Sequence, residues 1–164
     1  MARGVLSKNS EGEVIWFGGG AVRFKVRSED TGGACALIED KAPRGKTTPL
    51  HAHPTYEETF YVLEGEMLFH VDGEEASCGP GSAVSAPPGV PHAFLVTSEH
   101  ARFLTLFTPG DVAEAFIREG GDVPTSADAE PPPLDIPRVV AAGEKTGGMV
   151  FLGPPPFKAV DAHA

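Results

Sequence analysis

Short apolar runs separated by turn residues recur along residues 14–108, and this pattern constrains the fold more than any other feature of the sequence. Runs of β-branched and aromatic residues such as VIWF, TFYVL, MLFHV and HAFLV are separated by turns at Gly65, Gly73 and Gly81. Strands of this length and spacing are typical of a β-sandwich or barrel. We therefore expect an all-β fold, with no helix of any length before Pro109.

The residues after Pro109 carry a different pattern. The stretch DVAEAFIRE, which begins at Asp111, places Val112, Ala115 and Phe116 on one face and predicts a short amphipathic helix. Residues 123–137 are proline-rich and polar, which favours an extended strap. A second short helix fits residues 137–142, with Asp135 near its start, and the tail MVFLGPPPF is apolar enough to require burial.

The length of 164 residues suits one domain with extensions. We expect residues 1–164 to form this domain. Its N-terminal strands lie in residues 1–30, its barrel in residues 31–108, and a short helix with a proline-rich C-terminal extension in residues 109–164.

Charge and composition limit the partners and the compartment. The formal net charge of −10 repels phosphate backbones and anionic membrane surfaces, so we expect no nucleic acid partner and no membrane partner. The first residues lack the apolar core of a signal peptide, and no stretch approaches the roughly 18 apolar residues of a membrane span. Cys35 and Cys78 lack the spacing of a disulfide framework, which favours two buried, reduced thiols. We expect a cytoplasmic protein.

A group of histidines and glutamates carries the chemistry. Residues i and i+2 of a strand share a face, so His51 and His53 project into the same space. Such a pair alone is weak support for a site, because an exposed strand can carry two histidines without a chemical role. Glu58 shares parity with the apolar positions of its strand whereas Glu57 does not, and His92 follows a Pro/Gly-rich corner that could aim it at the same cavity. Three imidazoles and one carboxylate suit one divalent transition metal ion, Fe, Mn, Ni, Co, Cu or Zn, better than Ca or Mg.

The complete spacing resembles that of the cupin superfamily. The first cupin motif, G-x5-H-x-H-x3,4-E-x6-G, is matched by Gly45, His51, His53, Glu58 and Gly65. The second, G-x5-P-x-G-x2-H-x3-N, is matched by Gly81, Pro87, Gly89 and His92. Only Val96 departs, since it stands where the motif has an asparagine that does not bind metal. The resemblance implies a cupin double-stranded β-helix, a jelly-roll barrel, with a metal held by the three histidines and Glu58.

The stretches SEDTGGACALIE, HPTYEETFYVLEGE and FLGPPP are similar to those of bacterial single-domain cupins grouped with quercetin 2,3-dioxygenase. This resemblance implies a metal-dependent dioxygenase that acts on a small aromatic or enol-type substrate, with Glu58 as both ligand and general base. Strand parity and apolar faces suggest that the substrate contacts Phe60, Met67, Phe69 and Phe94. Plain core packing is the alternative reading for each of these four.

Other functions and features stay open beside the dioxygenase. A cupin site can also support a non-oxidative isomerase, lyase or cyclase, or bind a small molecule without turnover. Lys46 follows a glycine but lacks the context of a phosphate-binding loop. His70, His100 and His163 are expected to be solvated, and Trp16 to lie in the core or at a subunit contact. Because sheet edges invite pairing, the N-terminal strands suggest a homodimer.

Overall fold

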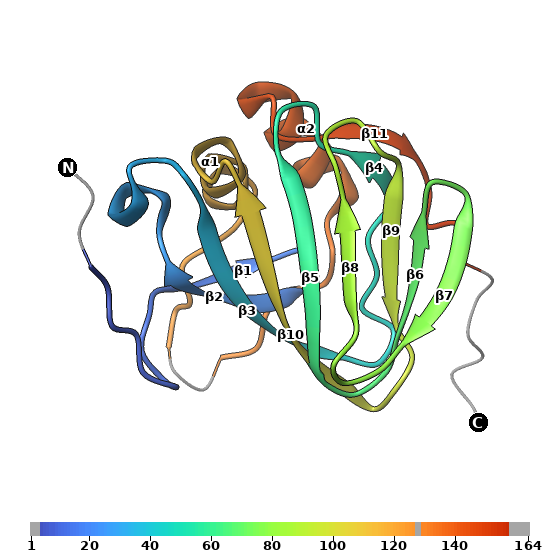
Figure 1. Cartoon of the computed structure of the whole chain (residues 1–164), viewed down its shortest axis with the longest axis horizontal. Helices are drawn as coiled ribbons and strands as arrows, with labels where there is room; N and C mark the ends of the chain where they lie inside the picture. Colours follow the sequence, from blue (N-terminus) through green and yellow to red (C-terminus); the bar gives the residue numbers. More distant parts are fainter. Residues whose placement is uncertain (1–3, 127–128, 158–164) are drawn as a thin grey trace.

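Two antiparallel sheets facing each other form the body of the molecule in the computed structural model, which describes residues 4–126 and 129–157 (Figure 1). One sheet has six strands in the order β1-β2-β3-β10-β5-β8, and the other has five in the order β11-β4-β9-β6-β7. The six strands are β1 (Val14–Phe17), β2 (Gly20–Val26), β3 (Ala36–Pro43), β10 (His100–Thr108), β5 (Glu57–Glu64) and β8 (Ala83–Ala86). The five are β11 (Val150–Gly153), β4 (Leu50–Ala52), β9 (His92–Val96), β6 (Met67–Val71) and β7 (Glu74–Cys78). The all-β prediction is confirmed.

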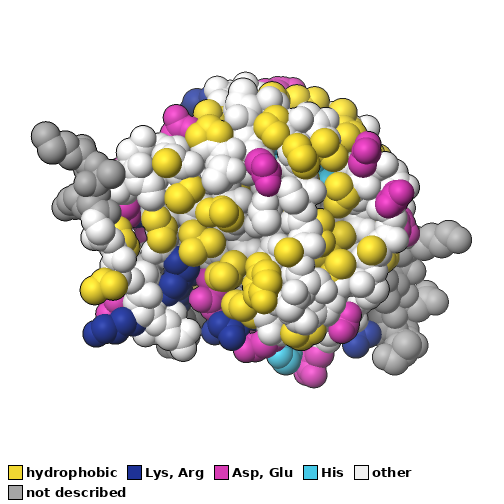
Figure 2. All heavy atoms as spheres, in the orientation of Figure 1, with side chains coloured by type: hydrophobic (Ala, Val, Ile, Leu, Met, Phe, Trp, Pro, Cys, Tyr) yellow, Lys and Arg dark blue, Asp and Glu magenta, His cyan; other side chains and the backbone are white. Residues whose placement is uncertain are grey.

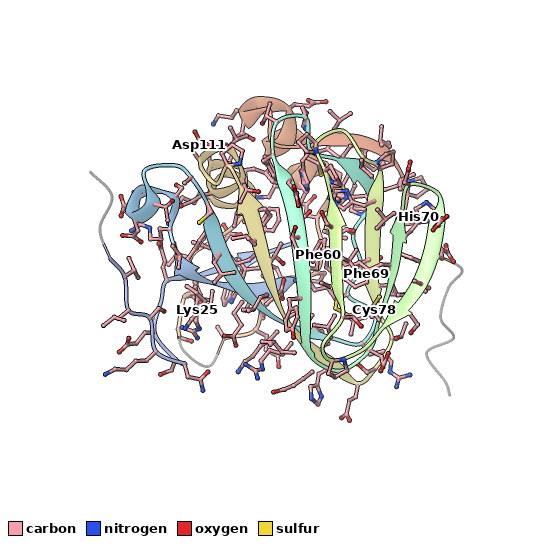
Figure 3. The ribbon with its side chains drawn as sticks, viewed as in Figure 1. Lys25, Phe60, Phe69, His70, Cys78 and Asp111 are labelled. Carbon is pink, nitrogen blue, oxygen red and sulfur yellow. The ribbon has the colours of Figure 1, made fainter. Side chains whose placement is uncertain are left out.

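Alternation of side chains along the strands builds the core between the sheets. In β5, Glu58, Phe60 and Val62 are buried while their neighbours are partly or fully exposed, as the period of two requires. Figure 3 shows Phe60 and Phe69 between the two sheets and His70 on the outer side of β6. The interior that results is rich in phenylalanine, and the side chains of the motifs project into it.

Three short elements, β7, β11 and a 3₁₀ turn, were not expected from the sequence. β7 has an exposed, polar sequence, EEASC, and pairs with β6 because the turn between them brings it back in register. Asp72 and Gly73 both adopt positive φ at that turn, which matches the right-handed twist of a hairpin. The expectation of no helix before Pro109 is wrong at one place, a single 3₁₀ turn, η1, at Ser28–Thr31.

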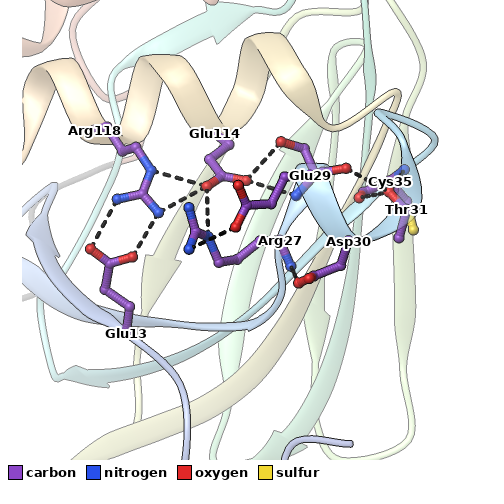
Figure 4. A network of polar contacts seen from close by, with 9 residues as sticks. Glu13, Arg27, Glu29, Asp30, Thr31, Cys35, Glu114 and Arg118 are labelled. Carbon is purple, nitrogen blue, oxygen red and sulfur yellow. Dashed lines mark hydrogen bonds and ion pairs between the residues drawn. The ribbon is translucent and has the colours of Figure 1, made fainter. Parts of the chain in front are cut away.

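Helix α1 (Asp111–Gly120) lies where the sequence predicts it, against the N-terminal strands. Its buried face consists of Ala113, Glu114, Phe116, Ile117 and Gly120. Ala115, which the periodicity placed on that face, is exposed, because the helix is rotated to bury Glu114. The Glu114 carboxylate accepts hydrogen bonds from Ser28 and Arg118, and Arg118 also contacts Glu13 (Figure 4). These polar contacts attach the helix to the chain before β3.

Helix α2 (Ile136–Thr146) confirms the second predicted helix and extends it at its C-terminal end. The Asp135 side chain caps its start by accepting a hydrogen bond from the Arg138 N–H, at 3.1 Å. Gly147 ends it in the left-handed conformation, with φ of 71°. The chain then continues through Gly148 into β11, which pairs with β4.

Two expectations about exposure need correction or qualification. The tail was expected to be buried, but only Met149 is, and Val150, Phe151 and Leu152 are 41–48% exposed because β11 lies at a sheet edge. Cys35 and Cys78 are free thiols as expected but are half-buried. Apolar side chains on the outer face of β3, β10, β5 and β8 are interspersed with polar ones (Figure 2), which is ordinary for a protein surface. None of the helices in the described residues is long and apolar enough to cross a membrane.

Candidate metal centre

Four side chains from both sheets meet between them. His51 lies in β4, His53 directly follows that strand, His92 begins β9, and Glu58 lies in β5 of the opposite sheet. His51 and His92 are paired across β4 and β9, which brings their ring centroids to 4.3 Å. All four side chains are buried, and one ligand atom from each lies within 4.8 Å of the others. The structure therefore brings together the complete set of residues that the sequence predicted as ligands.

The two adjacent glutamates have opposite environments. Glu58 is 9% exposed, and its Oε2 lies 2.8 Å from His53 Nε2 and 2.9 Å from His92 Nε2. Glu57 lies on the other face of β5, where it accepts hydrogen bonds from the hydroxyls of Thr59 and Ser85. The parity of the strand therefore directs Glu58 towards the histidines, as expected.

Backbone carbonyls orient all three imidazole rings. The Nδ1 atoms of His51, His53 and His92 lie 2.8, 2.7 and 2.9 Å from the carbonyl oxygens of Pro49, Gly148 and Val90. A carbonyl oxygen can only accept a hydrogen bond, so each Nδ1 carries the hydrogen. This tautomer leaves the Nε2 atoms with their lone pairs directed to the centre, as in proteins where a histidine binds metal through one nitrogen and a backbone partner through the other.

The donor set therefore needs a cation at its centre. Lone pairs of Nε2 on His53 and His92 converge on a carboxylate oxygen of Glu58, an arrangement that is repulsive unless a proton or a metal ion lies between them. Three neutral nitrogens and one carboxylate are the donors that divalent transition metals prefer. The residues present thus fit one such ion.

Electrostatics within the cluster follow from burial and proximity. Burial lowers the pKa of His51 to about 3, with smaller contributions from His92 and His53, so its ring is neutral. For Glu58, burial raises the pKa, but His53 and His92 together outweigh it and hold the pKa well below the usual range. Burial lowers the pKa of His92, and its contact with Glu58 more than offsets this and raises the pKa. The cluster therefore keeps its carboxylate negative, which favours a bound cation.

A cavity of about 70 Å³ adjoins the cluster. Its wall includes His51, His53 and Glu58, together with Phe60 and Phe94. Met67 and Phe69, the other two predicted substrate contacts, are not among its lining residues. They lie in the core cluster behind the wall, where Phe69 packs on Phe60 with ring centroids 5.1 Å apart. Substrate contact remains a prediction for all four, and the cavity favours Phe60 and Phe94.

Sequence reasoning missed the residues that support His53. The Tyr56 ring stacks on the imidazole with centroids 4.4 Å apart, and its hydroxyl donates to the Gly148 carbonyl at 2.8 Å. That carbonyl also accepts from His53, so one peptide group of the C-terminal segment orients both rings. The position of Tyr56 between two motif residues was a signal for its role, whereas the part played by Gly148, 95 positions after His53, had no local signal.

The histidines expected to be solvated lie apart from the cluster. His70 Nδ1 lies 3.4 Å from Glu75 Oε1 at the surface, and His100 is exposed. His163 lies outside the described residues. Trp16 is partly buried and forms a backbone bridge with Asp122. A buried pair that the sequence did not suggest, Asp40 and Lys46, also lines the cavity.

This combination of two facing sheets and a three-histidine, one-carboxylate cluster defines a cupin. The cupin domain family matches residues 37–107, so this part of the chain is a cupin domain. Over 115 residues it is 29% identical to quercetin 2,3-dioxygenase of Bacillus subtilis (strain 168), covering 70% of this chain but only 34% of that protein. The chain thus spans about a third of the length of this relative.

Solved structures agree on the fold. KdgF from Halomonas sp. superposes with a TM-score of 0.58 at 21% identity, covering 65% of this chain and 94% of that one. The polyketide cyclase RemF from Streptomyces resistomycificus has a TM-score of 0.53 at 28% identity, covering 66% of this chain and 80% of that one. The expected fold class, an all-β cupin with a C-terminal helical extension, is confirmed.

Proposed function

We propose that this protein is a metal-dependent dioxygenase of the quercetinase-like cupin type, acting on a small aromatic or enol-type substrate. The observation that carries the proposal is the cluster of His51, His53, Glu58 and His92, of which His51, His53 and Glu58 line a cavity with several phenylalanines. The similarity to a quercetin 2,3-dioxygenase supports the oxidative chemistry.

Different residues of the site would bind the metal, accept the proton and hold the substrate. His51, His53, His92 and Glu58 would hold one divalent transition metal ion, which supplies Lewis-acid polarisation of a substrate oxygen and redox chemistry with O₂. Glu58 would accept the proton of the substrate's enol or phenol hydroxyl at one carboxylate oxygen, which makes the ring electron-rich. Phe60 and Phe94 would hold a flat ring and keep water away from it.

Cavity size narrows the substrate class. The cavity of about 70 Å³ is far below the roughly 300–1,000 Å³ of sites that take drug-sized ligands. A single ring or a short enol fits this volume better than a flavonol, which would require the wall to open. We therefore infer a substrate smaller than that named for the Bacillus relative.

Oxygen uptake tests the proposal. Protein loaded separately with Fe²⁺, Mn²⁺, Ni²⁺, Co²⁺, Cu²⁺ and Zn²⁺ is assayed in an oxygen electrode with catechols, 1,3-diketone enols and a flavonol. We expect O₂ consumption with at least one redox-active metal and a small substrate. Stoichiometric metal binding without O₂ consumption by any combination would overturn the dioxygenase assignment.

A second candidate is a non-oxidative cyclase, isomerase or lyase, favoured by the resemblance to the cyclase RemF. In this case the same residues would hold the ion and Glu58 would move a proton between two positions of the substrate without O₂. Product formed by metal-loaded protein under anaerobic conditions would favour this class. Tight binding of substrate analogues without any product would instead indicate a binding cupin.

A further inference from the structure

Asp40 and Lys46 form a buried ion pair in the wall of the same cavity. Lys46 Nζ lies 2.7 Å from Asp40 Oδ2, and the two side chains are only 5% and 6% exposed. Asp40 lies in β3, where its side chain shares the inward face with Ile38. Lys46 lies in the loop before β4, and its ammonium group occupies the space that a side chain at Gly20 would fill.

The pair is incompletely satisfied. Asp40 Oδ1 is buried without a hydrogen-bond partner among the described residues. Within the same residues, the only hydrogen bond of Lys46 Nζ goes to Asp40 Oδ2. A buried carboxylate oxygen without a donor is strongly unfavourable, so this atom requires one from the contents of the cavity. Burial also raises the pKa of Asp40, which Lys46 opposes.

The pair and the metal cluster lie at different depths along the strands. Asp40 is opposite Phe103 of β10, which is opposite Val62 of β5, whereas Glu58 is opposite Phe107. These two rows are four residues apart, but both carboxylates line the same cavity, and burial together with the charge of Glu58 raises the pKa of Asp40. Phenylalanine side chains, including Phe60 and Phe94, line the space between them. The cavity therefore has two polar positions separated by aromatic walls.

We propose that Asp40 and Lys46 form a second polar anchor, which binds a hydroxyl group at the end of the substrate remote from the metal cluster. The hydroxyl donates to Asp40 Oδ1 and accepts from Lys46 Nζ. A carboxylate on the substrate would be repelled by the free oxygen of Asp40, and an ammonium would be repelled by Lys46. A hydroxyl can donate to the first and accept from the second, so it satisfies both partners. This inference rests on the proposed function, since the other end of the substrate is held at the metal cluster.

Matched ring compounds test the anchor by binding and not by turnover. The probes are catechols that carry either hydroxyl or fluorine at position 3 or 4, because fluorine is close in size to hydroxyl but donates no hydrogen bond. Calorimetry with the Zn²⁺-loaded protein without O₂ measures affinity. We expect at least one hydroxyl probe to bind about tenfold or more tightly than its fluorine counterpart.

Variants of Asp40 test whether the preference for the hydroxyl probe over the fluorine probe comes from the anchor. Asp40→Asn, which turns an amide N–H₂ to the cavity, should reduce the hydroxyl-to-fluorine affinity ratio to about one. Glu39→Gln makes the same chemical change at the neighbouring buried residue of β3, whose side chain does not line this cavity, and should keep the ratio. If Asp40→Asn fails to fold, the double variant Asp40→Asn/Lys46→Gln removes both buried charges and should lose the ratio equally.

Two results would overturn the anchor. One is an equal ratio in wild type and in the Asp40 variants, which would mean that water alone serves Oδ1. The other is a protein with one equivalent of zinc that binds none of the catechols. Failure of the proposed function would give different experimental results. The protein would bind no metal, or it would bind the hydroxyl probes selectively but consume no O₂ with any redox-active metal.

Discussion

At the residue scale, backbone carbonyls fix the orientation of the three clustered histidines. Each ring donates from Nδ1 to a backbone carbonyl, so the three rings are oriented by the chain before any ion arrives. Such preorganisation reduces the entropy lost on binding. Glu58 is selected over Glu57 by strand parity alone, which is why sequence reasoning identified the inward carboxylate.

Metal content separates the clustered histidines from the others. Replacing His92 with Ala should remove most bound metal, because it deletes one of four donors and the partner of Glu58. His70→Ala should leave the metal content unchanged, since His70 lies at the surface beside Glu75. Elemental analysis of both purified variants checks this. Equal metal content in the two would refute the assignment of His92.

At the element scale, the C-terminal extension acquires a role that was open in the sequence. Helix α2 ends at Gly147, so the next carbonyl, that of Gly148, reaches His53 and Tyr56, and β11 then pairs with β4 beside His51. The extension thus supports the candidate metal centre through Gly148 and β11.

Substitution at Gly148 tests this support. A Cβ atom there would lie 2.5 Å from Cβ of Phe116, so Gly148→Ala must displace the carbonyl that orients His53. We expect metal affinity to fall about tenfold, as is typical when the partner of a ligating histidine is lost. Gly153→Ala is the control, because nothing lies within 4 Å of its added Cβ. Competition titration with a chelator measures both, and equal affinities would argue against the support.

Helix α1 depends on one buried carboxylate. Glu114 accepts from the backbone N–H and hydroxyl of Ser28, at 2.7 and 2.8 Å, and from Arg118 at 2.8 Å. Glu114→Gln should lower the free energy of unfolding by about 2 kcal/mol, since an amide N–H₂ then faces donors. Glu119→Gln, on the same helix as Glu114, removes an exposed partner of Lys145 of α2 and should cost at most about 0.5 kcal/mol. Urea unfolding of both variants measures the difference.

The same variant predicts a pH dependence. Burial raises the pKa of Glu114, but Ser28 and Arg118 outweigh it, so the folded pKa lies below the ordinary 4.5. A lowered pKa contributes stability above the unfolded value, and this is lost as pH falls through the folded value. The stability gap between wild type and Glu114→Gln should therefore narrow as pH is lowered from about 6 to about 3. A gap that is constant over this range would show that the charge is not responsible.

At the scale of the whole molecule, the two facing sheets form one body, and they position the described elements around the site. The division into residues 1–30, 31–108 and 109–164 of one domain, the cytoplasmic location and the homodimer stay predictions. The N-terminal edge offers less pairing surface than expected, because Trp16 of β1 already pairs with Asp122. Sedimentation across a range of concentrations distinguishes a dimer from a species of 17.2 kDa.

By itself the sequence determined both helices of the extension, the four clustered side chains and every strand except β7 and β11. The strands and helices follow from local rules, namely the period of two and the capping residue Asp135. The complete ligand set followed from the resemblance of the motif spacings to those of cupins. The tertiary structure alone decided what lies around them. Gly148 behind His53, the Asp40–Lys46 pair in the cavity and the exposure of β11 arise from residues distant in sequence or from the position of a strand at a sheet edge. Side-chain contacts of this kind depend on which strands become neighbours, and no local pattern of residues specifies that.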